Sequence, residues 1–173
     1  MRIAALVPVI LVTILVIVFR EEMRKLQALG LPGVFLISIL ANSTVIIPVP
    51  GVVLTTTMGA VFPPFWVALA AGSGAALGEI TGYLAGYSGQ VVIENRRYYL
   101  RVVEWMKKYG GWTILFLAFI PNPAFDMAGI VAGALRMPLQ KFLLWCWVGK
   151  VLKMLVFALV GSGFFYWLNN IFK

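Results

Sequence analysis

The sequence predicts an all-helical integral membrane protein, and three observations support this. Hydrophobic residues make up 62% of the 173 residues, charged residues only 12%, and the mean hydropathy is +0.97, whereas a soluble domain is about half apolar and about a quarter charged. Several apolar segments approach the ~20 residues that a helix needs to cross a bilayer. Two other apolar segments are broken by prolines into halves too short to cross alone.

A single membrane domain is expected over residues 1–173, because this length suits one domain. Its elements are predicted in chain order: a transmembrane helix over 3–19, a re-entrant hairpin over 33–60, a transmembrane helix over 65–88, an amphipathic helix over 91–109, a second re-entrant hairpin over 112–135 and a transmembrane helix over 138–169.

The apolar run 3–19 follows Arg2, as in a signal peptide, but it is long for one. "REEMRK" follows instead of a small-residue cleavage site, which favours a retained transmembrane helix.

The two broken segments carry matching proline pairs. Pro48, Pro50 and Gly51 interrupt the first, and Pro121 and Pro123 interrupt the second. Each arm is about half a bilayer long at about 1.5 Å per helical residue. Broken helices at membrane depth are tolerated only inside protein or beside a watery cavity. The sequence therefore predicts two helical hairpins that each return to the side from which they entered.

The two halves of the chain resemble each other. When the proline pairs are aligned, Gly59 corresponds to Gly133 and Pro64 to Pro138, with a single residue inserted after the prolines in the second half. Broken hydrophobic segments at matching positions in two halves are typical of transporters built from inverted repeats. We therefore predict two inverted repeats, each a hairpin followed by a transmembrane helix.

The charges predict an orientation. The net charge is +8, and a basic excess marks the cytoplasmic side of a membrane protein. With two returning hairpins, one side carries most of the cations: Arg2, Arg96, Arg97, Arg101, Lys107, Lys108, Arg136 and Lys141. We therefore expect a cytoplasmic N-terminus and an external C-terminus, unless the last helix breaks near Gly161. The short tails favour a prokaryotic plasma membrane.

Segment 91–109 places its charges three or four residues apart, with valines and aromatic residues on the other face. A basic amphipathic helix with aromatic residues lies in the membrane interface. Two roles are open for this segment. It either binds lipid head groups beside a path that lipids follow, or it is a connector that is amphipathic only because it lies on the membrane.

Two stripes of residues run along the surface of the helix predicted over 65–88. One consists of glycines four residues apart, which allow close helix packing in a membrane: Gly74, Gly78, Gly82 and Gly86. The neighbouring stripe holds Glu79 and Tyr83. A carboxylate in a membrane helix costs about 2.5–3.5 kcal/mol and needs a cavity or a partner. The alignment that matches Pro64 with Pro138 nominates Lys153 as that partner, with Lys150, one turn earlier, as the competitor.

The second proline pair has polar neighbours. Asp126 follows Pro123 at the start of a half-helix, where a carboxylate is favoured by the helix dipole and can cap free amides. Its alternative role is contact with an ion or a lipid head group at the hairpin tip. Asn122 can satisfy amides that the prolines leave free, and Arg136 is expected to extend toward the interface.

The composition excludes several kinds of chemistry. The chain has no histidine and one cysteine, Cys146, which removes Ser–His and Cys–His catalysis and most zinc sites. We expect no enzyme activity, no metal and no cofactor. No basic module suggests nucleic-acid binding. Membrane phospholipids are the expected partners, together with a second copy of the chain as a possible homo-oligomer.

Two motifs resemble a known family. "GEITGYLAGYSG" is similar to the Glu-x-x-x-Gly-Tyr signature of the DedA superfamily, also called VTT-domain or SNARE-associated-Golgi-like proteins. "YGGWTILFLAFIPNPAFDMAGIVAGALRMPLQKFLLWCWVGK" resembles that family's second re-entrant loop and the span after it. The resemblance covers about residues 30 to 170. It implies two re-entrant hairpins with inverted pseudo-symmetry and the movement of lipids between leaflets.

The chain departs from the bacterial pattern of that family. Ala118 and Ala124 stand where bacterial members typically carry arginines, and "IPNPAFDMAG" is closer to the vacuole-membrane-protein branch. The loss of phosphate-binding arginines argues against a polyprenyl-phosphate role.

The predicted function is therefore a phospholipid scramblase or flippase with a polar groove. The residues predicted to line it are Glu79, Tyr83, Pro121, Asn122, Pro123, Asp126, Lys150 and Lys153. A proton- or ion-coupled secondary transporter of a small solute and a non-transporting membrane scaffold remain the alternatives.

Overall fold

A computed structural model describes residues 29–43, 51–89, 96–120 and 125–171, and every regular element in these ranges is a helix. The helices are α2 (Leu31–Ser43), α3 (Gly51–Gly59), α4 (Pro64–Gly78), α5 (Ile80–Ser88), α6 (Arg96–Tyr109), α7 (Gly111–Phe119), α8 (Phe125–Ala134) and α9 (Leu139–Ile171). The helix predicted over 3–19 lies outside the described residues.

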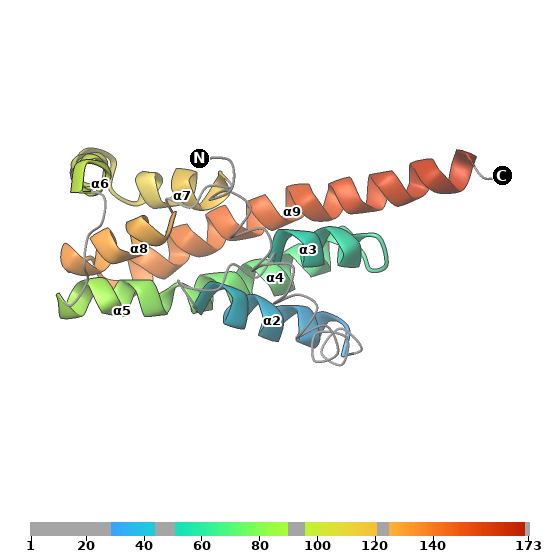
Figure 1. Ribbon diagram of the computed structural model, residues 1–173, viewed down its shortest axis with the longest axis horizontal. Coiled ribbons are helices and arrows are strands. Elements are labelled where there is room, and N and C mark those ends of the chain that lie inside the picture. Colours follow the sequence, from blue (N-terminus) through green and yellow to red (C-terminus); the bar gives the residue numbers. More distant parts are fainter. Residues whose placement is uncertain (1–28, 44–50, 90–95, 121–124, 172–173) are drawn as a thin grey trace, which may run out of the picture.

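Helix α9 runs along the whole length of the molecule (Figure 1). Within the described residues, its segment Leu139–Gly163 is the one helix that is both long and apolar enough to cross a membrane. The helix continues through Gly161 and Gly163, so the break considered there does not occur. The segment Gly161-Ser162-Gly163 can stay helical because it contains no proline, which would remove a backbone hydrogen-bond donor.

Helices α4 and α5 follow one another along the same axis as α9, in the opposite direction (Figure 1). The segment predicted as one span over 65–88 is thus divided at Glu79, between Gly78 and Ile80. α4 packs closely on α9. A Cβ atom at Gly72 would lie 2.6 Å from the Cα atom of Val151, so this crossing requires a glycine.

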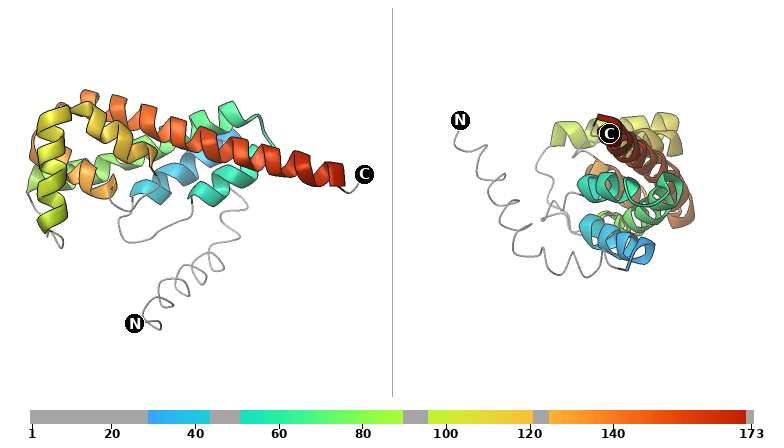
Figure 2. Two further views of the ribbon diagram at one scale, coloured as in Figure 1. Left: turned by 90° about the horizontal axis from the view of Figure 1, so that it is seen from above. Right: turned by 90° about the vertical axis from the view of Figure 1, so that its right-hand side faces the viewer.

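The four short helices form two pairs. α2 and α3 cover one half of the long axis, and α7 and α8 cover the other (Figure 1). α2 packs against α4 and α3 against α9, while α7 packs against α9 and α8 against α5. Within each pair, the C-terminal end of the first helix and the N-terminal end of the second point toward the middle of the molecule (Figures 1 and 2). The connecting residues, Pro48, Pro50 and 121–124, lie outside the described residues.

Glycines set the distance between these helices. A Cβ atom at Gly74 would collide with the carbonyl oxygen of Phe35, and one at Gly86 with that of Ile130. Gly161 lies in the same way against the carbonyl oxygen of Thr56. Small residues at such contacts let backbones approach where lipid provides no hydrophobic drive for association.

The buried apolar side chains form two clusters. The first includes Val102, Ile114, Val131 and Phe142, and joins α6, α7, α8 and the start of α9. The second joins α2, α3, α4 and the later part of α9, and its members are Val34, Ile37, Leu54, Met58, Val67, Ala68, Ala71, Ala75, Met154 and Ala158. Each pair of short helices therefore has an apolar core of its own.

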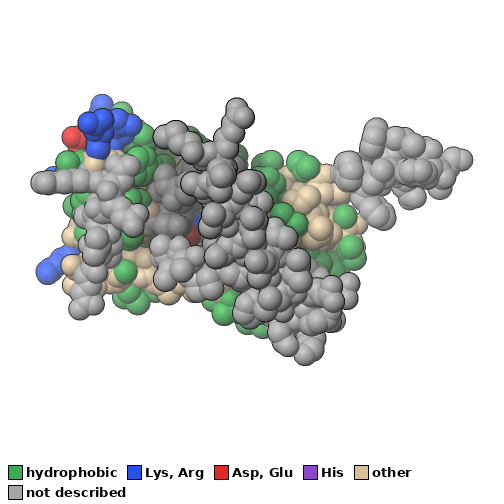
Figure 3. Space-filling view, in the orientation of Figure 1, with side chains coloured by type: hydrophobic (Ala, Val, Ile, Leu, Met, Phe, Trp, Pro, Cys, Tyr) green, Lys and Arg blue, Asp and Glu red, His purple; other side chains and the backbone are tan. Residues whose placement is uncertain are grey.

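Helix α6 lies across one end of the molecule and crosses the direction of α9 (Figure 2). Gly110, with φ of 57°, provides the turn that redirects the chain into α7. Lys and Arg side chains gather at this end (Figure 3), whereas none of the described residues at the opposite end is charged. Residues 96–109 of the predicted amphipathic segment thus form a basic helix at one end of the molecule.

The tight glycine contacts make a matched pair of variants informative. Gly161→Ala places a methyl group against the backbone of α3, so we expect a loss of about 1–3 kcal/mol from overpacking. Gly163→Ala, on the same helix, meets no atom within 4 Å and should leave stability unchanged or raise it, because alanine favours helix. Thermal unfolding of the purified protein in detergent measures both; equal stability of the two variants would contradict the packing described here.

Candidate functional site

A buried ion pair lies in the middle of the described structure. The Lys150 Nζ atom donates to the Glu79 Oε1 atom at 2.5 Å. Each residue is only 3% exposed. Glu79 comes from the junction between α4 and α5, and Lys150 from α9. The pair therefore links the two long segments that run along the molecule in opposite directions.

Asn42 completes the cluster. Its Oδ1 atom accepts a hydrogen bond from Lys150 Nζ at 2.8 Å, and its Nδ2 atom donates to the carbonyl oxygen of Ser38 at 2.9 Å. The second bond lies within α2 and fixes the orientation of the amide. The end of α2 is also held by Thr81, whose hydroxyl donates to the carbonyl oxygen of Ser43 at 3.1 Å.

The local sequence explains why Glu79 reaches this position. Gly78 lies against α2: a Cβ atom there would be 2.7 Å from the carbonyl oxygen of Ile39 and 2.8 Å from the Cβ atom of Asn42. The glycine thus allows α2 to approach just before the carboxylate. Glu79 has a φ of −68° and a ψ of −11°, so the chain stays close to helical while α4 ends and α5 begins.

The polar cluster separates the two apolar cores. Cys146, Lys150 and Met154 are four residues apart on α9 and so share one face. Cys146 belongs to the core around α7 and α8, and Met154 to the core around α2 and α3. Lys150 lies between them on α9, where it bonds to Asn42 near the end of α2 and follows Gly149, which lies against Leu115 and Ala118 of α7. In a bilayer, this would be near the middle of the membrane.

The cluster can exchange partners with charged ligands. Lys150 offers an ammonium group with three donors, and Glu79 offers carboxylate oxygens that only accept when ionised. A phosphate could replace the carboxylate at Lys150, and an ammonium group could replace the lysine at Glu79. Within the described ranges, no three His, Cys, Asp or Glu side chains gather in a way that could hold a metal ion.

The structure decides between the two predicted partners of Glu79. The carboxylate pairs with Lys150, the competitor one turn earlier, whereas the alignment of the two halves nominated Lys153. Lys153 is half-buried, three residues further along α9. Helical geometry is the reason, because three residues turn a side chain by about 300° and displace it by about 4.5 Å along the axis.

Tyr83 lies one turn after Glu79, but its hydroxyl donates to the carbonyl oxygen of Met137 at 2.5 Å. Its ring stacks on Phe142 with centroids 5.2 Å apart and on Tyr87 at 6.2 Å. Tyr83 thus ties α5 to the connection between α8 and α9, and the structure does not bring its hydroxyl into the cluster.

Other predicted residues fall in different places. Gly74 and Gly78 face α2 and Gly86 faces α8, while Gly82 is buried. Gly51 begins α3. The remaining predicted site residues lie outside the residues whose side chains are described: Pro48, Pro50, Pro121, Asn122, Pro123 and Asp126. Arg136 is exposed, with its guanidinium carbon 5.8 Å from the centroid of the Tyr87 ring.

Asn42 is the member of the cluster that the sequence analysis missed. Its signal was present, because "ANST" interrupts an apolar segment shortly before Pro48. Like Asn122, Asn42 is a polar amide near the end of a predicted half-helix, where it can bond to a neighbouring polar group. Trp147 was also overlooked; its indole nitrogen donates to the Ser73 hydroxyl at 2.8 Å, joining α9 to α4 beside a groove of about 460 Å³.

The burial of the pair predicts a double-mutant outcome. Lys150→Met should destabilise the protein by about 3–5 kcal/mol, because it leaves the Glu79 carboxylate buried without its cation. Adding Glu79→Gln removes that charge and should recover much of the loss. Unfolding in detergent of the wild type, both single variants and the double variant measures the coupling; strictly additive losses would show that the two charges do not stabilise each other.

Comparisons with known proteins show which proteins this chain is similar to. The family model of the VTT domain matches residues 49–163, more than half of the chain. Two plant proteins of Arabidopsis thaliana are similar: vacuole membrane protein KMS2 is 32% identical over 103 residues, and vacuole membrane protein KMS1 is 31% identical over 94 residues. These alignments cover 57% and 52% of this chain but only 24% and 23% of the relatives, so the chain matches about a quarter of their length.

No solved structure matches the chain. Neither the family description nor the names of the two relatives mention an enzymatic activity. The vacuole-membrane branch that the motif "IPNPAFDMAG" indicated is the branch to which both relatives belong by name. The chain belongs to the VTT-domain family, the integral membrane proteins of the DedA type.

Proposed function

We propose that the protein moves phospholipids between the two leaflets of a membrane, as a scramblase or flippase. The observation that carries the proposal is the buried cluster of Lys150, Glu79 and Asn42. A head group that crosses a bilayer needs polar partners near its middle, because leaving charge unpaired there is costly. This cluster supplies a cation, a carboxylate and an amide.

The chemistry of the cluster suits phospholipid head groups. The Lys150 ammonium group is a partner for the phosphate, and the Glu79 carboxylate is a partner for the ammonium group of a zwitterionic head group. In the resting protein these two side chains satisfy each other. A passing head group would exchange one internal ion pair for two external ones, so neither protein charge is left unpaired during transfer.

The proposal includes two inverted repeats with re-entrant hairpins, and reciprocal glycine contacts support it. On α3 and α8, Thr56 and Gly59 of the first half align with Ile130 and Gly133 of the second. On the long segments, Tyr83 and Gly86 align with Ala158 and Gly161 after one further inserted residue.

The glycine contacts between helices agree with this alignment. Gly86 lies against Ile130, and its counterpart Gly161 lies against Thr56. Likewise, Gly133 lies against Tyr83, and its counterpart Gly59 lies against Ala158. Each pair of short helices thus uses its second helix to contact the long segment of the other half.

This register differs by one residue from the alignment that nominated Lys153. When Gly86 is aligned with Gly161, the counterpart of Glu79 is Met154, whose sulfur accepts a hydrogen bond from the Thr55 hydroxyl at 3.3 Å. The carboxylate therefore has no charged counterpart in the other half. A polar pathway that uses it would be asymmetric across the membrane.

We propose that the hairpin tips complete this pathway. Asn42 stands at the end of α2, just before the first predicted tip, and Ile120 directly precedes the second. Pro121, Asn122, Pro123 and Asp126 would then offer an amide, a carboxylate and free backbone amides to the same head group. The names of the relatives refer to a vacuole membrane, which gives no support to a prokaryotic plasma membrane.

A liposome assay tests the proposal. Vesicles with fluorescent phospholipid in both leaflets are treated with dithionite, which reduces only the outer leaflet. We expect quenching beyond half in vesicles that contain the wild type, and a loss of at least tenfold in rate with Glu79→Gln. Glu104→Gln is the matched control, because Glu104 is an exposed carboxylate on α6. Quenching that stops at half with verified wild-type protein would refute lipid transport.

A proton-coupled secondary transporter is the second candidate, and the buried carboxylate favours it. A carboxylate held beside an ammonium group inside a membrane is typical of proton relays. The two functions differ in their dependence on a gradient. Lipid exchange that is independent of an imposed pH difference favours passive scrambling, whereas uptake of a small solute that follows the pH difference and disappears in Glu79→Gln favours the transporter.

A further inference from the structure

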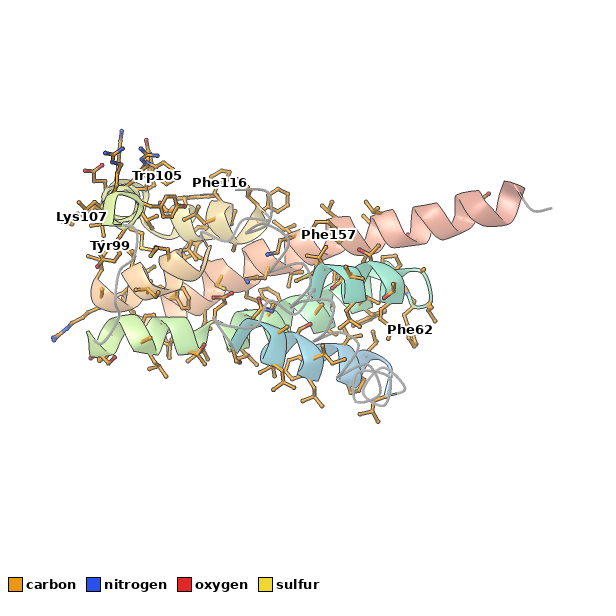
Figure 4. All side chains as sticks on the ribbon, viewed as in Figure 1. Phe62, Tyr99, Trp105, Lys107, Phe116 and Phe157 are labelled. Atoms are coloured by element: carbon orange, nitrogen blue, oxygen red, sulfur yellow. The ribbon has the colours of Figure 1, made fainter. Side chains whose placement is uncertain are left out.

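A groove of about 380 Å³ lies between α6 and α7, at the basic end of the molecule. Trp105 and Tyr109 of α6 line it together with Trp112 and Phe116 of α7, and it extends to Ile120 at the end of that helix. Figure 4 shows Trp105 and Phe116 on neighbouring helices. None of the described residues that line the groove is charged, and its volume falls in the range of about 300–1,000 Å³ that is usual for small-molecule sites.

The walls of this groove are held in place. The Thr113 hydroxyl donates to the carbonyl oxygen of Trp105 at 2.9 Å, which joins the start of α7 to α6. On the other side, the Trp112 ring packs on Trp145 of α9 with centroids 4.9 Å apart, and Gly111 lets the chain pass directly over the Trp145 indole. The groove is therefore formed in advance, which lowers the entropic cost of binding.

Two cations flank the groove. Arg101, Trp105, Lys108 and Tyr109 lie at helical spacing along α6, so they share one face of it. All four are exposed, and Lys108 Nζ lies 5.1 Å from the centroid of the Tyr109 ring. Lys107 is two residues from Trp105, about 200° around the helix, and so lies away from the groove.

We propose that this groove binds an anionic phospholipid, with an acyl chain against the aromatic walls and the phosphate against Arg101 and Lys108. On this face the two cations outnumber the one carboxylate, Glu104, so the net charge beside the apolar lining complements an anionic head group, and α6 lies where an interfacial helix would. A peptide would fit poorly, because it would bring backbone amides that this lining cannot satisfy. The groove leads to Ile120, directly before the second predicted hairpin tip, so the inference builds on the proposed function and names its substrate class.

Burial raises the pKa of the Tyr98 phenol, while nearby Arg101 lowers it to a smaller extent. Tyr98 packs against the apolar core on the inner side of α6. Arg101 is exposed one turn after Tyr98, so its charge can meet a phosphate.

Tryptophan fluorescence tests the inference on the full-length protein. The protein is reconstituted in phosphatidylcholine vesicles with increasing fractions of phosphatidylglycerol that has brominated acyl chains. We expect saturable quenching, with half-saturation at a lower fraction than for brominated phosphatidylcholine. Arg101→Gln and Lys108→Gln should each raise the half-saturating fraction about fivefold, the effect of one cation near an anionic surface. Lys107→Gln, the matched control, should leave it unchanged.

Three results would overturn the groove site: equal quenching by the two lipids, an equal shift from Lys107→Gln and Lys108→Gln, or undiminished saturable quenching after Trp105→Phe and Trp112→Phe together. The transport assay separates this inference from the proposed function. Transport without saturable binding would refute the groove site but not the proposed function. Saturable binding without transport would refute the proposed function but not the groove site.

Discussion

The pairing of Lys150 with Glu79 is the constraint on which the rest of the structure depends. A charge inside a membrane must find a partner, and removing one member of a buried pair leaves the other uncompensated. The pair fixes the register of α9 against the junction of α4 and α5. Asn42 extends the constraint to α2, because its oxygen accepts from the same ammonium group. Three helical segments are thus positioned by one polar cluster.

Packing around this cluster uses small residues more than large ones. Lipid provides no hydrophobic drive for helix association, so contact area must come from close backbone approach. Gly78 brings α2 against the residue before Glu79, and Gly72 brings α9 against α4. The glycines therefore do more than shorten distances. They place the helix that carries Asn42 and the helix that carries Lys150 within hydrogen-bond reach of one another and of the carboxylate.

Under the proposed function, two chemically different regions, the basic helix α6 and the polar cluster around Lys150, would both take part in lipid movement. The basic helix α6 would concentrate anionic lipid at one end of the molecule. The polar cluster offers a second set of partners near the centre, between two apolar cores. The groove between α6 and α7 extends to Ile120, at the end of α7. Because the Glu79 carboxylate has no charged counterpart in the other half of the chain, the two directions of lipid movement would pass different groups.

The sequence by itself determined the membrane class, the all-helical character of the described residues and the glycine positions on the α4–α5 segment. These follow from composition and from the spacing of prolines and glycines, which act locally. It also identified Glu79 as a residue that needs a partner. The tertiary structure decided which partner: the alignment of the two halves nominated Lys153, whereas packing of α9 on α4 brought Lys150 to the carboxylate. It also decided that Asn42 joins them and that the Tyr83 hydroxyl bonds to Met137, because such contacts depend on the rotation of one helix against another.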